Sequence, residues 1–528
     1  MQFQAGMRSR SADHGHTGRL SSPPLGRRAA TLRINILSNY AGQIWMAVMA
    51  VMFLPLYIRI LGIEAFGLVG LMLSFQSISQ LFDFGIGGAT NRELSRRIHD
   101  PALVDGMRDL VRSSEIVIWL LAVAVGIIIW ACSGLMADHW LHISHMGRGE
   151  AVRAIAIMGV TIALLWPSAF YNNCLSGLER QPALNVINAV FATLRYAGVI
   201  PVLWAVPSLA AFLWWYALVG ALQSLATAIV VWRALPRGRR PARWSSAQLH
   251  DSSRFAGGLF LIGALAMGLT QLDRLSIASL RPLAELGYYT LALSVAAGLG
   301  RMVQPMFNAI YPRFSRLVAR GEVATLRELY HLSSQYLVVV VAAVAVVLIV
   351  FAHDVLFLWT GDSALATKVA LPMAILVAGS ALNGLMNIPY ALQLADGWTR
   401  LAAGINAVSL LLGIPFCLWA VPRFGISGAA CMWLLANLAP VVVGIPLMHR
   451  RLLRGEMANW YLRDILPSVL AASAVALTLR LLLPPLPRTI LGAAWLAFAS
   501  LITLAVSALA SKAVRAAGTA WLRGRLAS

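Results

Sequence analysis

The chain contains about fourteen windows of roughly 20 predominantly apolar residues, separated by short polar segments. A helix of this length crosses the hydrocarbon core of a bilayer, so the pattern predicts a polytopic membrane protein. Composition agrees, because 59% of the 528 residues are hydrophobic and only 12% are charged. The first two windows cover residues 36–60 and 65–90, and the others begin near Ser113, Ala151, Ala183, Leu209, Arg254, Glu285, His331, Ala366, Trp398, Phe424, Asp464 and Arg488.

The basic residues predict the orientation of these spans. The formal net charge is +21, and most of the 42 Lys and Arg residues fall in the N-terminal tail, in alternate connections and at the C-terminus. Positively charged connections stay in the cytoplasm, so we expect both termini to be cytoplasmic. No basic face with interleaved aromatic residues is apparent, which argues against nucleic acid as a partner.

One half of the chain repeats in the other. The sequence INAV at residues 187–190 returns at 405–408, and LWAVP at 203–207 returns at 418–422, with three weaker matches in the same order. Six spans separate equivalent positions, so the halves have the same orientation. We therefore expect an all-α membrane protein with two parallel-repeated six-helix lobes around a central cavity and two additional C-terminal helices. The expected divisions are a disordered cytosolic tail (1–33), an N-terminal lobe (34–235), a cytoplasmic linker (236–253), a C-terminal lobe (254–448), two extra helices (464–510) and a basic cytosolic tail (511–528).

Several motifs resemble a known family. They are Leu54–Tyr57, Leu61–Gly67, Asp83–Ile86, Gln271–Arg274, Glu285–Tyr289 and Phe424–Ala430. Together they resemble bacterial polysaccharide exporters that flip lipid-linked oligosaccharides, the O-antigen-type branch of the multidrug/oligosaccharidyl-lipid/polysaccharide exporter superfamily. The resemblance implies a location in the bacterial inner (cytoplasmic) membrane. It also implies alternating access around a central cavity and, commonly, coupling to a cation gradient. The two extra helices occur only in some branches, which include the lipid II flippases.

Three arginines lie within the predicted spans, namely Arg195, Arg274 and Arg301. A charged side chain at bilayer depth costs roughly 2.5 to 3.5 kcal/mol on insertion scales, so each needs a partner or a wet cavity. A guanidinium is suited to holding a lipid pyrophosphate through charge-assisted hydrogen bonds. A structural ion pair with a neighbouring helix is the alternative for each of them. We treat all three as substrate-binding candidates.

Two acidic residues within spans, Asp273 and Asp83, are candidates for coupling to H⁺ or Na⁺. Asp273 precedes Arg274 in the same helix, and the two side chains point about 100° apart. Asp83 precedes a glycine-rich stretch, where accepting hydrogen bonds from exposed backbone is the structural alternative. Glu64 lies in the first outer turn, and a lone acid in a short turn is expected to be solvated.

Neutral polar residues within the spans allow two interpretations. Most are expected to form hydrogen bonds between helices, although a cavity that holds sugars also uses such groups. The members of this set are Gln43, Gln76, Gln80, Asn172, Asn173, Asn188, Gln304, Asn308, Asn383, Asn387, Asn406 and Asn437.

Three classes of function fit these features. The leading one is a transporter that moves a polyprenyl-pyrophosphate-linked oligosaccharide, such as an O-antigen, exopolysaccharide or capsule unit, between leaflets. A cation-coupled exporter of small organic cations, or a lipid II-type flippase, is the alternative. A polymerase or ligase is disfavoured because the longest outer connection, about residues 136–150, is short, so we expect no enzyme activity.

The expected partners are the lipid-linked oligosaccharide, membrane lipids and the polysaccharide polymerase machinery. We expect no resident cofactor and no metal site, since the four cysteines show no CxxC spacing.

Overall fold

The computed structural model describes residues 42, 45, 46, 48–83, 85–98, 103–482 and 487–526, and the tail expected at residues 1–33 lies outside this part of the chain. Within the described ranges the protein is helical, with a single isolated bridge between His142 and Pro282. Among the described residues, ten helical segments are long and apolar enough to cross a membrane, and shorter apolar helices cover Val48–Leu61 and Ile63–Ser79. The expected all-α membrane fold is confirmed.

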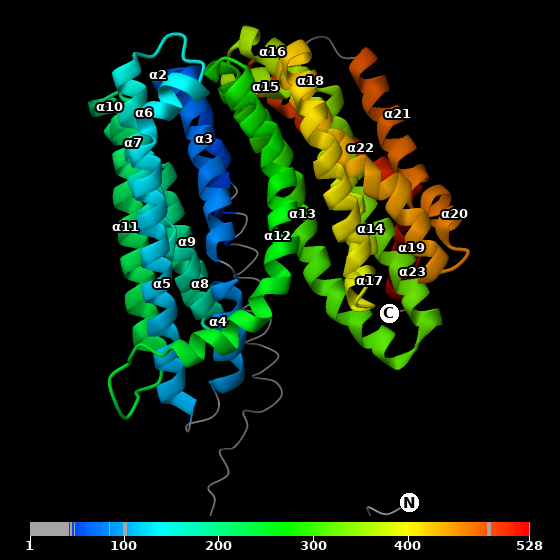
Figure 1. Ribbon diagram of the computed structural model, residues 1–528. Helices are drawn as coiled ribbons and strands as arrows, with labels where there is room; N and C mark the ends of the chain where they lie inside the picture. Colours follow the sequence, from blue (N-terminus) through cyan, green and yellow to red (C-terminus); the bar gives the residue numbers. More distant parts are fainter. Residues whose placement is uncertain are drawn as a thin grey trace, which may run out of the picture.

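The first half forms one group of helices, which occupies the left side of Figure 1. Prolines begin several of its segments, where the missing N–H costs no helical hydrogen bond. Its elements are α2 (Leu54–Leu61), α3 (Ile63–Ser79), η1 (Gln80–Asp83), α4 (Ile86–Arg97), α5 (Val104–Ala131), α6 (Ser133–Leu135), η3 (Met136–Trp140), α7 (Arg148–Leu165), α8 (Pro167–Gly177), α9 (Gln181–Tyr196), α10 (Val199–Ala205) and α11 (Leu209–Ala234).

The second half forms the other group. Its longest helix, α18, is interrupted at Gly425, whose backbone (φ 57°, ψ −138°) is accessible to glycine and not to other residues. The interruption divides α18 into two spans, close to the predicted start at Phe424. The elements of this half are α12 (Ser246–Leu280), α13 (Leu283–Arg320), α14 (Val323–Val350), α15 (Ala352–Thr360), α16 (Ser363–Leu385), α17 (Asn387–Ala395), α18 (Thr399–Ala439), η4 (Pro440–Gly444) and α19 (Ile445–Arg451).

The last part of the chain packs against α14 on the side away from the first half (Figure 1). Asp464 joins it to α14, because its carboxylate contacts His331 Nδ1 at 2.5 Å and accepts a hydrogen bond from Gln335 Nε2 at 2.8 Å. The elements are α20 (Met457–Asn459), η5 (Trp460–Ile465), α21 (Leu466–Leu482), α22 (Ile490–Ala510) and α23 (Lys512–Leu526).

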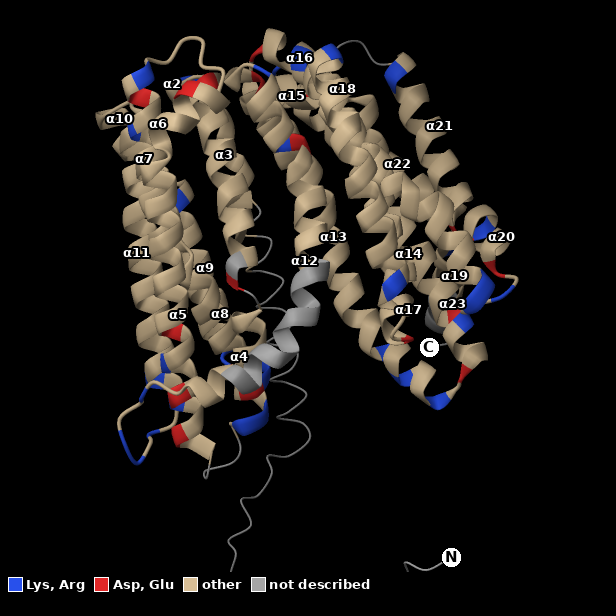
Figure 2. Ribbon diagram, in the orientation of Figure 1, with Lys and Arg blue, Asp and Glu red and all other residues tan. Residues whose placement is uncertain are grey.

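The surface of the helices has the character of a lipid-facing surface. Large apolar side chains are strongly exposed, for example Ile490 at 91%, Leu481 at 86% and Trp204 at 72%. Figure 2 shows charged residues gathered near the two ends of the helices, with few between them. An apolar exterior of this extent requires lipid around it, since soluble monomers rarely expose large apolar patches.

The two halves meet where α3 crosses α13. A Cβ added to Gly67 would overlap the backbone oxygen of Leu283, and one added to Gly287 would overlap the backbone oxygen of Ile63. Gly67 and Gly287, like Ile63 and Leu283, are equivalent positions in the sequence repeat. The crossing is therefore approximately symmetric, and it depends on two positions without side chains. Away from this crossing the two groups diverge, except where α12 also packs against α4 and α5 of the first half (Figure 1).

The connection between the halves is fixed to the first half. Asp109 on α5 accepts hydrogen bonds from the Arg240 guanidinium at 2.5 Å and from the Arg243 backbone N–H at 2.8 Å. The Ser113 hydroxyl likewise accepts a hydrogen bond from the Ser245 backbone N–H at 2.8 Å. Helix α12 begins directly after this contact, at Ser246, within the segment expected to be linker.

Candidate functional site

Arg195 and Arg301, which come from different halves of the chain, line one pocket of about 280 Å³. Arg195 lies near the end of α9, and Arg301 lies in the middle of α13. The pocket is large enough for the head group of a ligand and too small for an oligosaccharide. Met46, Ala50, Asn188, Ala192, Tyr196 and Gln223 complete its lining.

A chain of hydrogen bonds orients Arg195. Its Nη2 donates to Gln223 Oε1 at 2.5 Å, and Gln223 Nε2 donates to Asn188 Oδ1 at 3.1 Å. The amide of Asn172 donates to the same oxygen at 3.4 Å. The buried Nε of Arg195 has no hydrogen-bond partner among the described residues. The guanidinium is therefore held in place while part of its donor capacity is unused.

The pocket carries positive charge without a compensating acid. Its lining includes no Asp or Glu. Within the described part of the chain, neither Arg195 nor Arg301 forms an ion pair. Two guanidiniums in such surroundings favour an anion with several acceptor oxygens, because each offers a planar set of donors. A phosphate or pyrophosphate matches this arrangement.

Pro305 affects the backbone at Arg301. Pro305 lies inside α13, four residues after Arg301, and it has no N–H to donate to the Arg301 carbonyl. A proline at this position bends a helix and leaves that carbonyl without its helical partner. Arg301 therefore lies where α13, the helix that crosses α3 of the first half, has lost one helical hydrogen bond.

Asp273 and Arg274 do not join this pocket. Asp273 is 3% exposed, and its carboxylate accepts hydrogen bonds from the Tyr289 hydroxyl and from the Arg274 backbone N–H. The Arg274 guanidinium donates to Gln271 Oε1 at 3.3 Å. As expected from their spacing, the two side chains have different partners. The structure thus separates Arg274 from the other two substrate-binding candidates.

Asp83 also lies apart from the arginine pocket. Both of its carboxylate oxygens accept from the Gly87 backbone N–H at 3.1 Å, across the break between η1 and α4. This contact satisfies one of the exposed amides at the start of α4, as in a helix cap. The geometry is that of the structural alternative stated above.

Glu64 is buried, and the expectation of a solvated carboxylate is wrong. It is 7% exposed and accepts hydrogen bonds from three consecutive backbone N–H groups, those of Ser144 at 2.6 Å, His145 at 2.9 Å and Met146 at 3.0 Å. Three donors compensate for the loss of water around the charge. The partners are backbone groups of a loop about 80 positions away, so the sequence around Glu64 carried no signal for them.

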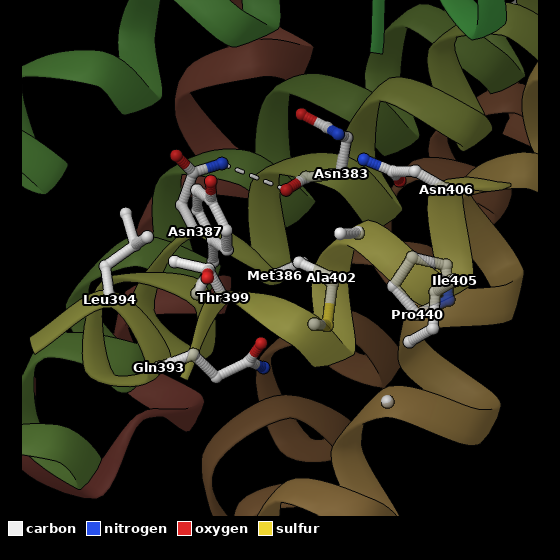
Figure 3. Close-up of a pocket in the computed structure, with 13 residues that line it drawn as sticks. Asn383, Met386, Asn387, Gln393, Leu394, Thr399, Ala402, Ile405, Asn406 and Pro440 are labelled. Carbon is white, nitrogen blue, oxygen red and sulfur yellow. Dashed lines mark hydrogen bonds between the residues drawn. The ribbon is translucent and has the colours of Figure 1, made fainter. Parts of the chain in front are cut away.

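A second pocket, of about 400 Å³, lies within the second half and was not predicted as a site. It lies between the end of α16, α17, the start of α18 and η4, and Figure 3 shows the side chains that line it. Asn383, Asn387 and Asn406 among them belong to the set of neutral polar residues identified in the sequence. The available signal was the return of the INAV sequence, which pairs Asn406 with Asn188 of the arginine pocket.

Comparison with known proteins adds to this geometry. The chain is 19% identical over 402 residues to a protein named "Putative O-antigen transporter" from Shigella flexneri, which covers 76% of this chain and 93% of that protein. The family described as "MatE" matches residues 259–419.

Two solved structures show the same fold. An inward-facing multidrug resistance MATE family transporter aligns with a TM-score of 0.62 at 16% identity, covering 79% of this chain and 94% of that one. The lipid II flippase MurJ, in an inward closed conformation, aligns with a TM-score of 0.62 at 12% identity, covering 89% and 97%. The family described as "Polysaccharide biosynthesis protein" matches residues 32–318, more than half of the sequence, and the chain belongs to that family.

Proposed function

We propose that this protein moves a polyprenyl-pyrophosphate-linked oligosaccharide from the inner to the outer leaflet of the bacterial cytoplasmic membrane. The observation that carries the proposal is the pocket shared by Arg195 and Arg301, which has two guanidiniums and no acid. A pyrophosphate is the part of such a lipid that this pocket fits. Family membership and the likeness to an O-antigen transporter support the same cargo.

The shared pocket also suggests how movement is coupled to binding. Because Arg195 and Arg301 belong to different halves, an anion that bridges them favours the arrangement in which the halves approach each other there. Binding and conformational change are then linked through the difference in affinity between two arrangements. The protein acts by alternating access, without catalysis, and draws on an H⁺ or Na⁺ gradient.

A lipid II-type cargo is the second candidate. The two C-terminal helices α21 and α22 favour it, and the MurJ match extends over 89% of the chain, compared with 79% for the MATE match. An exporter of organic cations fits less well, because the arginine pocket would repel a cationic ligand.

The test is deletion of the gene in its native host, followed by analysis of lipid-linked glycans in the inner leaflet. Accumulation of an O-antigen, exopolysaccharide or capsule precursor supports the proposal, accumulation of lipid II supports the second candidate, and absence of any accumulation contradicts both.

Complementation then tests the pocket. We expect Arg195→Ala and Arg301→Ala each to reduce export by about tenfold or more, the effect of losing a charge-assisted contact. The matched control is Arg320→Ala, since Arg320 is 67% exposed and pairs only with Glu322, at 3.6 Å, among the described residues. Equal export by the Arg195 variant and the control, at equal abundance, would contradict the role of the pocket.

A further inference from the structure

The pocket in the second half has the chemistry of a site for neutral, hydroxyl-rich groups. No charged residue is among those that line it. Four amides contribute to it, those of Asn383, Asn387, Gln393 and Asn406, together with the side chains of Tyr390 and Thr399. An amide both donates and accepts hydrogen bonds, and so does a sugar hydroxyl. A volume of about 400 Å³ is within the range of small-ligand sites.

Two of these amides are unused. Gln393 is 2% exposed, and within the described ranges its amide has no hydrogen-bond partner. Asn406 likewise makes no side-chain hydrogen bond in the described part of the chain. In Figure 3, Asn406 lies along the upper edge of the pocket and Gln393 along the lower edge. Both side chains line the pocket, so their amides offer donors and acceptors that a ligand with hydroxyl groups can use.

The sequence repeat relates this pocket to the arginine pocket. Asn188 lines the first and Asn406 lines the second, and the two occupy equivalent positions in the repeated INAV sequence. Seven residues later the first copy has Arg195 and the second has Gly413. The space beside Gly413 is filled by the Met432 side chain, which a Cβ at Gly413 would overlap. The equivalent positions therefore differ, with a charged side chain in the first half and none in the second.

Helix α13 contacts both pockets, because Arg301 lines the arginine pocket and Phe307 packs against Tyr390 of the amide pocket. Phe307 on α13 stacks on the ring of Tyr390, with centroids 6.2 Å apart and planes at 24°. Phe307 also stacks on Tyr311 at 5.8 Å and 6°. Arg301 precedes Phe307 by six residues, which corresponds to about 9 Å of helix rise. Of these three rings only Tyr390 lines the amide pocket, where it adds an aromatic group beside the amides. Phe307 therefore links α13 to the wall of the pocket, although its side chain points about 120° away from that of Arg301 around the helix.

We propose that the amide pocket binds sugar residues of the glycan that is attached to the pyrophosphate held by Arg195 and Arg301. The inference rests on the proposed function and names a second contact region for the same cargo. It assigns recognition of the charged link to the first half and to α13, and recognition of neutral sugars to α16, α17 and α18.

Binding measurements on the full chain in nanodiscs test this division, with two probes. The first is farnesyl pyrophosphate, which has the lipid and the pyrophosphate without sugar. The second is the polyprenyl-pyrophosphate glycan that a host strain deleted for this gene accumulates. The variant is Gln393→Leu/Asn406→Leu, and the matched control is Gln181→Leu, an amide that bonds to Ser176 at 2.9 Å and lines neither pocket.

We expect the double variant to bind the glycan lipid at least about tenfold more weakly and to bind farnesyl pyrophosphate as the wild type does. Unchanged binding of farnesyl pyrophosphate also shows that the variant is folded. If the double variant binds the glycan lipid normally, or loses both probes equally, the sugar site is refuted. Failure of the proposed function looks different, because Arg195→Ala would then bind both probes like the wild type.

Discussion

The crossing of α3 and α13 predicts the effect of adding a single methyl group. Gly67 and Gly287 face backbone oxygens of the opposite half, and an added Cβ would lie well inside the 3.4 Å at which ordinary van der Waals contact begins. Backbone atoms have little freedom to withdraw. Gly67→Ala or Gly287→Ala should therefore push the two halves apart at this crossing.

The magnitude follows from the nature of the contact. Overpacking a close contact costs about 1 to 3 kcal/mol, which changes the ratio of separated to closed arrangements by about 5- to 160-fold. Alanine also stabilises a helix relative to glycine by about 1 kcal/mol, so a control must carry the same gain. Gly298→Ala provides it, because Gly298 lies on α13 and a Cβ there would meet no heavy atom within 4 Å.

Labelling of a buried position measures the separation. Thr290 on α13 is 9% exposed and faces Gly70 across the same contact. In a background from which the four native cysteines are removed, Thr290→Cys should react slowly with a water-soluble maleimide on protein in nanodiscs. Adding Gly67→Ala should raise the labelling rate about 5- to 160-fold, and adding Gly298→Ala should leave it unchanged. Equal rates in all three proteins would refute the reasoning.

Three further predictions concern topology, a buried carboxylate and pH. A cysteine at Ser363 should react with an impermeant maleimide in whole cells, whereas one at Ser246 should react only after lysis; the reverse result would invert the proposed orientation. Asp273→Ala should lower the thermal unfolding temperature, because it leaves the buried Tyr289 hydroxyl without its acceptor. The expected cost is about 1 to 3 kcal/mol, and an unchanged unfolding temperature would contradict this prediction. The hydrogen bond from Asn459, with smaller contributions from His331 and Arg327, lowers the pKa of the Glu456 carboxyl in the folded protein. Glu456 therefore contributes stability that is present above about pH 5 and is lost as the pH falls through the lowered pKa. On acidification the unfolding temperature of Glu456→Gln should fall less than that of the wild type.

Much of the fold was predictable because each span carries its own signal. The apolar window expected at Leu209 begins at that residue in α11, and the start expected near Phe424 coincides with the interruption at Gly425. Membrane spans follow from length and hydropathy, and the backbone satisfies its hydrogen bonds within each helix. The repeat could be recognised for a related reason, since equivalent positions occur in the same order at offsets of 215 to 220 residues.

The composition of the site was less predictable, because it depends on which helices meet. Arg195, Arg274 and Arg301 look alike in the sequence, yet only Arg195 and Arg301 line the same pocket. Glu64 is buried by backbone amides that only the folded chain brings near it. Hydropathy and spacing contain no information about such contacts, which involve residues far apart in the chain.

The fixed connection between the halves has a consequence for their relative motion. The contacts of Asp109 and Ser113 leave no slack chain before α12, and α12 then continues without a break from Ser246 to Leu280. A rotation of one half against the other must then be absorbed by bending of this 35-residue helix. The helix interior includes Gly263, where a Cβ would meet no heavy atom within 4 Å. A relative rotation of the two halves would therefore require α12 to bend, because the connection before it offers no slack.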